Sequence, residues 1–259
     1  MGQVDTKPFP GDRSVRPRRL KAIIEVVRRS FFPKGLFVVV LGPDGVGKST
    51  TIQHLQLELQ RLFGSCRKER WRPGLIRRVA PDTGNRIPHA KSLRRPLGSA
   101  LSVLGLALDF SIGYLVSSRP AIARSEAIIF DRYFHDLLID PKRYRYAGPM
   151  WLPQLLSRLI PPRRPVFVVL DADEDLILSR KQELPLHELR RQRVAYKTFA
   201  ARMPHSMIIR TDQPVKNIVS EIVANIMTIK NYRGATTLGS WQHQDMSLAS
   251  QSADSRSYR

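Results

Sequence analysis

The sequence predicts an α/β fold built on a doubly wound parallel sheet. Several short apolar runs are rich in β-branched side chains and contain no glycine or proline, which is typical of buried parallel strands. These runs are residues 36–41, 127–130, 166–170 and 207–209, with a weaker candidate around residues 70–72. Helical patterns alternate with them at residues 49–63, 99–115, 150–159, 174–180, 186–202 and 215–229. Strands that alternate with helices indicate a sheet covered by helices on both faces.

The composition limits the class of protein. The chain has 259 residues, of which 42% are hydrophobic, enough for one sizeable domain with a real core. We expect a basic N-terminal extension over residues 1–33, the domain over residues 34–230, and a disordered C-terminal tail over residues 231–259. The single cysteine, Cys66, allows neither an intrachain disulfide nor a cysteine-rich metal site. This fits a reducing compartment, and we expect a cytoplasmic protein.

The charge balance indicates an anionic partner. Lys and Arg number 43 against 22 Asp and Glu, a net charge of +21, which attracts nucleotides, nucleic acids and anionic membranes without choosing among them. Residues 96–117 are apolar over about the ~20 residues of a bilayer helix. However, Asp109 lies in the middle of this segment, where a charge costs roughly 2.5–3.5 kcal/mol on insertion scales. We therefore expect a buried helix, covered on most sides, and no transmembrane span.

The strongest motif lies between the first predicted strand and the first predicted helix. Residues 42–49 read GPDGVGKS and fit G-x-x-x-x-G-K-[ST], the phosphate-binding P-loop. In this motif, backbone N–H groups and the following helix N-terminus surround phosphates, and we expect Lys48 to bridge the β- and γ-phosphates and Ser49 to ligate Mg²⁺. The sequence thus predicts a P-loop NTPase fold with ATP and Mg²⁺ as cofactors. The predicted nucleotide-binding residues are Gly42, Asp44, Gly45, Val46, Gly47, Lys48, Ser49 and Thr50.

A second motif, Asp131-Arg132-Tyr133, ends the strand at residues 127–130. Ligands of open α/β sheets bind beyond the carboxyl ends of the strands, where this triplet and the P-loop would meet. Asp131 is a candidate for the magnesium site, and Arg132 for bidentate binding of a phosphate. An ion pair that merely closes the strand would give the same triplet.

A third candidate is the basic segment of residues 180–191, which follows the strand at residues 166–170. A small basic lid can close over a triphosphate, exclude water and stabilise developing charge. We assign this role to Arg180, and Arg190 or Arg191 is a further candidate. We expect Arg193 and Lys197 to lie on a solvated helix face.

Together these residues resemble the thymidylate kinase family over residues 35–229. The resemblance rests on the P-loop with an acid at its third position, the strand that ends in Asp-Arg-Tyr, and LDADEDLILSRK followed by LHELRRQRVAYKTFA. It implies a five-stranded parallel sheet with helices on both faces, ATP, Mg²⁺ and a monophosphate acceptor. It also implies that Asp44 contacts the acceptor's sugar, Arg132 holds the acceptor's phosphate, Asp131 serves the magnesium and the reacting phosphates, and Arg180 begins the lid.

The segments that read the base depart from the family pattern. Arg70-Trp71-Arg72-Pro73 replaces the Phe-Pro-x-Arg-like element, which leaves Trp71 as a loose candidate for stacking, and an arginine expected around residues 110–111 is absent. After Asp-Arg-Tyr the chain reads FHDLLIDPKRYRYAGP, which resembles thymidylate-kinase-like proteins of bacterial surface-polysaccharide gene clusters. The machinery for phosphate transfer looks intact, whereas the machinery for base recognition looks altered.

The predicted function is that of an ATP-dependent phosphotransferase of the nucleoside monophosphate kinase type, with dTMP as the acceptor that the resemblance favours. One alternative is a kinase for a sugar or nucleoside. Another is a non-catalytic ATP-binding P-loop protein associated with nucleic acid, for which the net charge is the main argument. Few aromatic residues are interleaved with the basic ones, so nucleic acid is not required. Assembly as a homodimer is left open.

Overall fold

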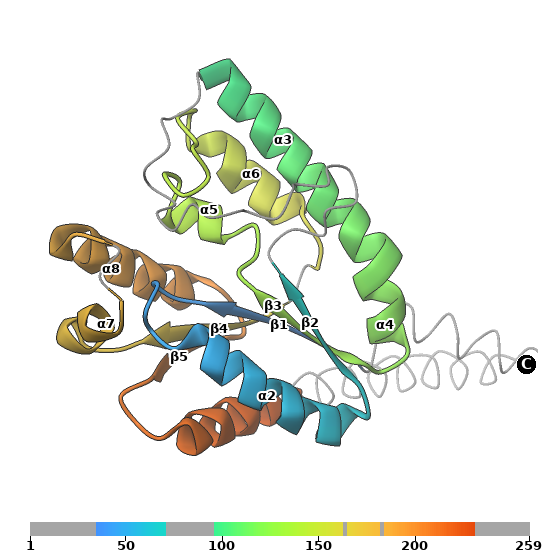
Figure 1. The fold of residues 1–259 in the computed structure, drawn as a ribbon. Coiled ribbons are helices and arrows are strands. Elements are labelled where there is room, and N and C mark those ends of the chain that lie inside the picture. The colour runs from blue at the N-terminus through green and yellow to red at the C-terminus, as the bar shows by residue number, and fades with distance from the viewer. Residues whose placement is uncertain (1–34, 71–95, 163–164, 182–183, 231–259) are drawn as a thin grey trace, which may run out of the picture.

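The computed structural model describes residues 35–70, 96–162, 165–181 and 184–230. The predicted N-terminal extension, the predicted C-terminal tail and Trp71 lie outside these residues. The described chain forms a five-stranded sheet in the order β2-β3-β1-β4-β5, and every strand pair is parallel. Helices cover both faces of this sheet (Figure 1). The predicted fold class is confirmed.

The four stronger strand predictions are confirmed, and the weaker one is displaced. The strands are β1 (Leu36–Leu41), β2 (Cys66–Arg70), β3 (Ala127–Asp131), β4 (Val166–Asp171) and β5 (Ser206–Arg210). The fifth strand was expected around residues 70–72 but ends at Arg70. Among the described strands it lies at the edge of the sheet, and it reads CRKER; charged side chains are typical of edge strands.

The central strand β1 divides the core into two layers. All six of its residues are buried, and successive side chains point to opposite faces of the sheet. Phe37, Val39 and Leu41 pack with α3 (Pro96–Gly113), α5 (Asp136–Ile139), α6 (Trp151–Leu159) and part of α8 (Leu186–Arg202). The alternate residues pack with α2 (Lys48–Phe63), α7 (Glu174–Arg180) and the helix of residues 215–230.

The apolar segment of residues 96–117 forms a longer helix than expected. The helix α3 continues through a π-helical turn (Tyr114–Ser118) into α4 (Arg119–Ala123). Its inner side enters the core through Val103, Ala107 and Phe110, and Asp109 is only 5% exposed.

The expectation that this helix is covered on most sides is wrong. Only 39% of its most apolar 18-residue window, which has a mean hydropathy of 1.7, is buried. The helix α6 and the aromatic residues after β3 pack against one side of this helix, and among the described residues nothing covers the opposite side. Within the described ranges it is the one helix long and apolar enough to cross a membrane, judged by length and composition.

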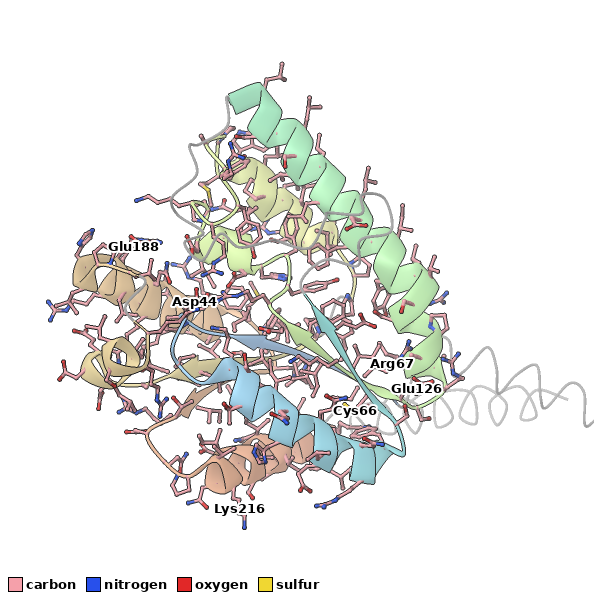
Figure 2. The ribbon with its side chains drawn as sticks, in the orientation of Figure 1. Asp44, Cys66, Arg67, Glu126, Glu188 and Lys216 are labelled. Carbon is pink, nitrogen blue, oxygen red and sulfur yellow. The ribbon has the colours of Figure 1, made fainter. Side chains whose placement is uncertain are left out.

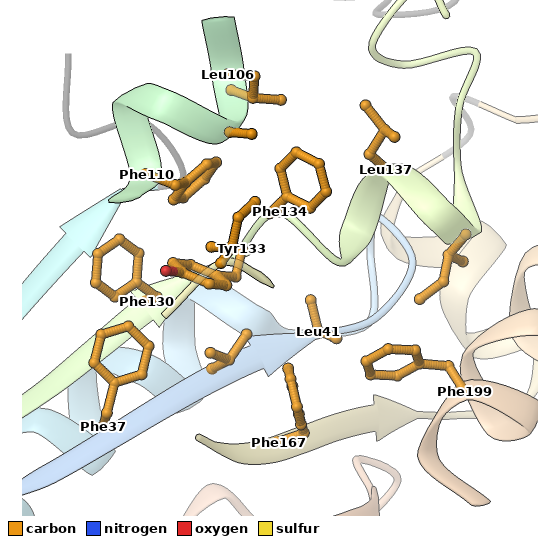
Figure 3. Close-up of a cluster of buried hydrophobic side chains, with 14 of the residues drawn as sticks. Phe37, Leu41, Leu106, Phe110, Phe130, Tyr133, Phe134, Leu137, Phe167 and Phe199 are labelled. Atoms are coloured by element: carbon orange, nitrogen blue, oxygen red, sulfur yellow. The ribbon is translucent and has the colours of Figure 1, made fainter. Parts of the chain in front are cut away.

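An aromatic cluster fixes the chain just after β3. Tyr133 packs edge-on against Phe110 at 4.5 Å and against Phe130 at 5.2 Å between ring centroids (Figure 3). Its hydroxyl donates a hydrogen bond to the carbonyl of Pro161. Both Tyr133 and Phe134 are almost fully buried. The residue that precedes them, Arg132, is therefore held at the carboxyl end of the sheet.

Candidate active site

The loop of residues 42–47 joins β1 to α2 in a backbone shape that suits glycine. Gly42 has φ 146° and Gly45 has φ 87°, both in the region that other residues rarely adopt. A Cβ at Gly42 would lie 2.6 Å from the carbonyl oxygen of Leu170, and one at Gly45 would lie 2.9 Å from that of Ile177. The loop therefore packs closely against the end of β4 and against α7 at positions where only glycine fits, and its binding of phosphates stays a prediction.

Neighbouring strands hold this loop in place. Val46 is fully buried, and its carbonyl accepts a hydrogen bond of 2.8 Å from the hydroxyl of Thr211, which follows β5. Ser49 and Thr50 lie in the first turn of α2 and are exposed. Both residues are thus open to solvent, and the role of Ser49 as a magnesium ligand stays a prediction.

Lys48 points back into the loop. Its ammonium donates to the carbonyls of Gly42 at 2.9 Å and Pro43 at 2.6 Å, and lies 3.5 Å from Oδ1 of Asp44. Burial and the nearby charge of Arg132 lower the pKa of Lys48 to about 7, even though surrounding carboxylates favour its charged form. An anion such as a triphosphate would therefore stabilise the charge of this lysine.

The Asp131-Arg132 pair lies beside the P-loop, as expected. Asp131 ends β3 in register with Val40 of β1, and it is partly exposed. The backbone N–H of Arg132 donates to the carbonyl of Val40 at 3.1 Å. Arg132 has φ 68°, an uncommon left-handed conformation for a residue with a side chain. This turn directs its guanidinium toward the P-loop side of the sheet.

Asp136, which the sequence analysis did not single out, binds the guanidinium of Arg132. It is fully buried and accepts hydrogen bonds from Nη1 of Arg132 at 2.9 and 3.1 Å. The hydroxyls of Tyr196 and Tyr144 donate to it at 2.6 and 3.0 Å. Burial by itself raises the pKa of Asp136. Arg132, Arg143 and the two hydroxyls lower it by a larger amount, so the net pKa lies below its usual value. Asp136 is thus a buried carboxylate that orients a guanidinium.

Arg143 is a second residue that sequence reasoning missed. It lies in the segment that departs from the family pattern. Its Nε donates to Asp140 at 3.3 Å, and its Nη2 donates to Oδ2 of Asp44. The other oxygen of Asp44 accepts a hydrogen bond of 2.5 Å from Nη2 of Arg132. No local pattern marks Arg143, because 99 residues separate it from Asp44 in the chain.

Asp44 is the point at which these groups meet. It lies at the carboxyl end of the sheet, above the start of α2 (Figure 2). Burial would raise its pKa, but the charges of Lys48, Arg132 and Arg143 hold that pKa well below its usual range. Its side chain is 16% exposed. Asp44 is therefore a carboxylate at the edge of the solvent with three cations around it.

The structure brings Arg180, but not the other lid candidates, to the P-loop. Nη1 of Arg180 lies 3.6 Å from the position that a Cβ on Gly47 would occupy. Arg190 instead pairs with Glu174 at 2.8 Å, while Arg191 pairs with Glu188 at 2.7 Å. Arg180 thus lies along the loop at the end of α7, where the sequence placed the start of a lid.

The expectation of a solvated face at Arg193 is wrong. Arg193 is 13% exposed, and its Nε donates to Asp171, the last residue of β4, at 2.8 Å. Lys197 is 46% exposed, yet its ammonium lies 2.9 Å from the same carboxylate. The two cations tie α8 to the end of β4. Helix periodicity could not show this, because the partner lies on another element.

The described residues contain no group of three His, Cys, Asp or Glu side chains that could hold a metal ion. Magnesium in phosphoryl-transfer sites takes one or two protein ligands together with phosphates and water. Ser49 and Asp131 therefore stay predictions as its ligands.

Comparison with known proteins gives a structural relationship and no sequence relationship. No protein-family model and no curated protein sequence matches this chain. A solved structure of thymidylate kinase from Ehrlichia chaffeensis matches with a TM-score of 0.52 over 74% of this chain and 98% of that chain, at 18% identity. The chain has a thymidylate-kinase-like fold. The resemblance stated from the motifs is confirmed at this level, and an identity of 18% shows the fold alone.

Proposed function

We propose that the chain is an ATP-dependent phosphotransferase of the nucleoside monophosphate kinase type, which transfers the γ-phosphoryl group of ATP to a small anionic acceptor. The observation that carries this proposal is the meeting of a P-loop and two anchored guanidinium groups at Asp44. A P-loop alone would suit many ATP-binding proteins. A second cationic centre within reach of the P-loop lysine suits an enzyme with two anionic substrates.

The donor side is assigned to the P-loop and α7. When bound there, ATP with Mg²⁺ would supply the phosphoryl group to be transferred. Lys48 would exchange its carbonyl contacts for phosphate oxygens, and Ser49 with Asp131 would serve the metal. Arg180, lying along Gly47, would add positive charge on the lid side.

The acceptor side is assigned to Arg132 and the surface behind it. A hollow lined in part by Ser99, Ser102 and Tyr144 lies between α3 and the segment after α5. The hydroxyl of Tyr144 also donates a hydrogen bond to Asp136, the carboxylate that orients Arg132, so Tyr144 links the hollow to this site. The volume of the hollow, about 10 Å³, is close to that of a single water molecule, so this hollow by itself does not hold a sugar or a base. By its fold relative the favoured acceptor is dTMP, and the alternative is a sugar or a nucleoside.

An acceptor screen tests this proposal. The full-length protein is incubated with ATP and Mg²⁺ against nucleoside monophosphates, nucleosides and phosphorylated sugars, and ADP formation is measured. Lys48→Ala should reduce turnover by about 10²–10³ without unfolding the protein. Lys216→Ala is the matched control, because Lys216 is exposed on the helix of residues 215–230, remote from Asp44 (Figure 2).

Two results would contradict the proposal. Near-normal turnover by folded Lys48→Ala protein would remove the P-loop from the mechanism. ATP binding with no turnover on any acceptor, together with salt-sensitive binding of nucleic acid, would instead support a non-catalytic ATP-binding protein. The net charge of +21 is the observation that favours this second candidate.

We also propose that the protein is a cytoplasmic homodimer that buries the outer face of α3. Every exposed residue between residues 97 and 116 is Leu, Ile, Val or Gly. The large side chains of this outer face, which continues into the π-helical turn after α3, are 39–75% exposed: Leu97, Leu101, Leu104, Leu108 and Ile112 of α3, and Leu115 and Val116 of the turn.

Area and charge favour a second copy as the partner. These side chains recur every three or four residues and so form one apolar stripe, and a contiguous exposed apolar patch of this kind marks an interaction site. A standard interface buries about 800 Å² per partner, so this face would supply much of a dimer contact. The exposed residues between 97 and 116 carry no charge. Two copies of a strongly basic chain could therefore meet there without direct repulsion.

Light scattering coupled to gel filtration tests the dimer. Leu108→Lys on the outer face should yield a monomer, whereas Leu57→Lys, at an exposed leucine of α2, should leave the dimer intact. A monomeric unsubstituted protein would contradict the proposal. Sedimentation of the protein with anionic vesicles at high salt would indicate a membrane as the partner instead, because salt screens purely electrostatic adsorption.

A further inference from the structure

Two guanidinium groups from different parts of the chain bind the two oxygens of one carboxylate. Nη2 of Arg132 lies 2.5 Å from Oδ1 of Asp44, and Nη2 of Arg143 donates to Oδ2. Arg132 follows β3, whereas Arg143 lies in the segment after α5. The two side chains thus converge on one point in front of the P-loop, where they present two hydrogen-bond donors to a single anion.

Each guanidinium is held by a carboxylate of its own. Asp136 binds Nη1 of Arg132 and has a fully buried side chain. Asp140 binds Nε of Arg143 at 3.3 Å, has a side chain that is 1% exposed, and also accepts a hydrogen bond of 3.1 Å from Gln192. The buried acids fix the two cations in place. The converging nitrogens are therefore preorganised, and their orientation does not depend on Asp44.

Asp44 differs from these two acids in a way that makes it displaceable. Its side chain is 16% exposed, whereas those of Asp136 and Asp140 are almost wholly buried. A soluble anion could therefore reach its position from solvent. Guanidinium groups bind carboxylate and phosphate with the same paired geometry. In this arrangement the carboxylate of Asp44 has the contacts that a phosphate group would make.

The position next to Lys48 makes this site relevant to phosphoryl transfer. Oδ1 of Asp44 lies 3.5 Å from the ammonium of Lys48. In the proposed function Lys48 binds the β- and γ-phosphates of ATP. An anion that replaced the Asp44 carboxylate would thus lie beside the donor's terminal phosphate, which is where an acceptor must be placed.

We infer that Arg132 and Arg143 jointly form the phosphate-binding site for the acceptor, and that Asp44 occupies this site as an internal competitor which the acceptor displaces. This inference rests on the proposed function and deepens it. It assigns Arg143 as a specificity-determining residue, and it makes the acceptor a phosphate monoester, not a neutral sugar or nucleoside.

Binding of inorganic phosphate tests the inference without any need for turnover. The full-length protein is first saturated with a non-hydrolysable ATP analogue and Mg²⁺, so that the P-loop is occupied. Phosphate is then titrated calorimetrically, with sodium chloride at matched ionic strength as the control for non-specific attraction. Phosphate lacks a sugar and a base, so changes in its dissociation constant report on the anion site alone.

Three variants are compared with the unsubstituted protein. Arg143→Gln should weaken phosphate binding about tenfold, as expected for loss of a charge-assisted hydrogen bond. Lys142→Gln removes the same charge from the adjacent, exposed position and should change binding less than about twofold. Asp44→Asn removes the competing charge and should tighten binding about fivefold.

The outcomes separate this inference from the proposed function. Equal phosphate binding by Arg143→Gln and Lys142→Gln would overturn it, as would the absence of tightening in Asp44→Asn or the absence of binding by the unsubstituted protein. Turnover is judged separately in the acceptor screen. If the protein is an active kinase but its phosphate binding does not depend on Arg143, only the inference is refuted. An Arg143-dependent anion site in a protein that transfers phosphate to no acceptor refutes only the proposed function.

Discussion

Replacing Asp136 with asparagine should destabilise the protein strongly, although the two side chains have nearly the same shape. Asp136 is fully buried and accepts four hydrogen bonds: two from Arg132, one from Tyr144 and one from Tyr196. The substitution removes the negative charge that compensates the buried Arg132. It also replaces one carboxylate oxygen with an NH₂ group, which cannot accept a hydrogen bond from a guanidinium or a hydroxyl.

The expected magnitude follows from what remains near Arg132. Removing one partner of a buried ion pair typically costs roughly 3–5 kcal/mol, because the other charge stays buried without compensation. Arg132 keeps Asp44 at 2.5 Å, but the Asp44 side chain is partly exposed and is shared with Arg143. We therefore expect a loss near the lower end of this range, about 3 kcal/mol.

Urea denaturation followed by circular dichroism measures this loss as a shift in midpoint at unchanged slope. Asp175→Asn on the exposed start of α7 is the control, and it should cost less than about 1 kcal/mol. A double-mutant cycle with Arg132→Met isolates the pair, and the double variant should be more stable than the sum of the single losses implies. A loss below about 1 kcal/mol for Asp136→Asn, or strict additivity in the cycle, would refute the reasoning.

Three further predictions concern the same site. Arg132→Lys should raise the acceptor's KM or lower kcat by about tenfold while leaving ATP affinity almost unchanged, since a point charge cannot replace a planar fork; steady-state kinetics in both substrates would show the reverse if the donor and acceptor sides were exchanged. Because the pKa of Lys48 is lowered to about 7, by burial first and then by Arg132, binding of ATP should take up close to one proton near pH 8 and almost none near pH 6; calorimetry in buffers of different ionisation enthalpy measures this uptake, and uptake that persists in Lys48→Met would disprove the assignment. Burial lowers the pKa of His135 to about 4, so between about pH 6.5 and pH 4 the unfolded chain binds a proton that the folded chain does not, and stability should fall by about 3 kcal/mol as the pH is lowered through this window; His135→Phe should flatten this slope in urea denaturation, and an unchanged slope would exclude His135 as its source.

The fold could be predicted where neighbouring residues in the chain set the local structure. The buried strands β1, β3 and β4 read as apolar runs because both of their faces are covered, and the limits of α7 and α8 agree with the helical pattern. The expected position of β2 was displaced, because the sequence of an edge strand can be charged and then contains no apolar run that marks its position. The helical stretch of residues 97–123 was expected to be buried, since composition cannot show which side of an apolar helix the sheet covers.

The candidate site could be predicted only in part. Residues 42–49 could be singled out because the P-loop motif consists of residue types at fixed, consecutive positions. Arg132 and Arg180 were found because each follows a recognisable strand or helix. Asp136 lies only one helical turn beyond Arg132, but a single acid at that spacing is too common in proteins to stand out.

By itself the sequence determined the parallel sheet, the glycine-rich loop between β1 and α2, and the elements from which Lys48 and Arg132 extend. These depend on backbone conformation and side-chain burial, which neighbouring residues in the chain largely set. Only the tertiary structure decided that Arg143 meets Asp44, that Arg193 binds Asp171, and that the outer face of α3 is exposed. Such contacts join elements that are far apart in the chain. Their strength depends on distance and on exclusion of water, and packing sets both only after the sheet and helices have come together.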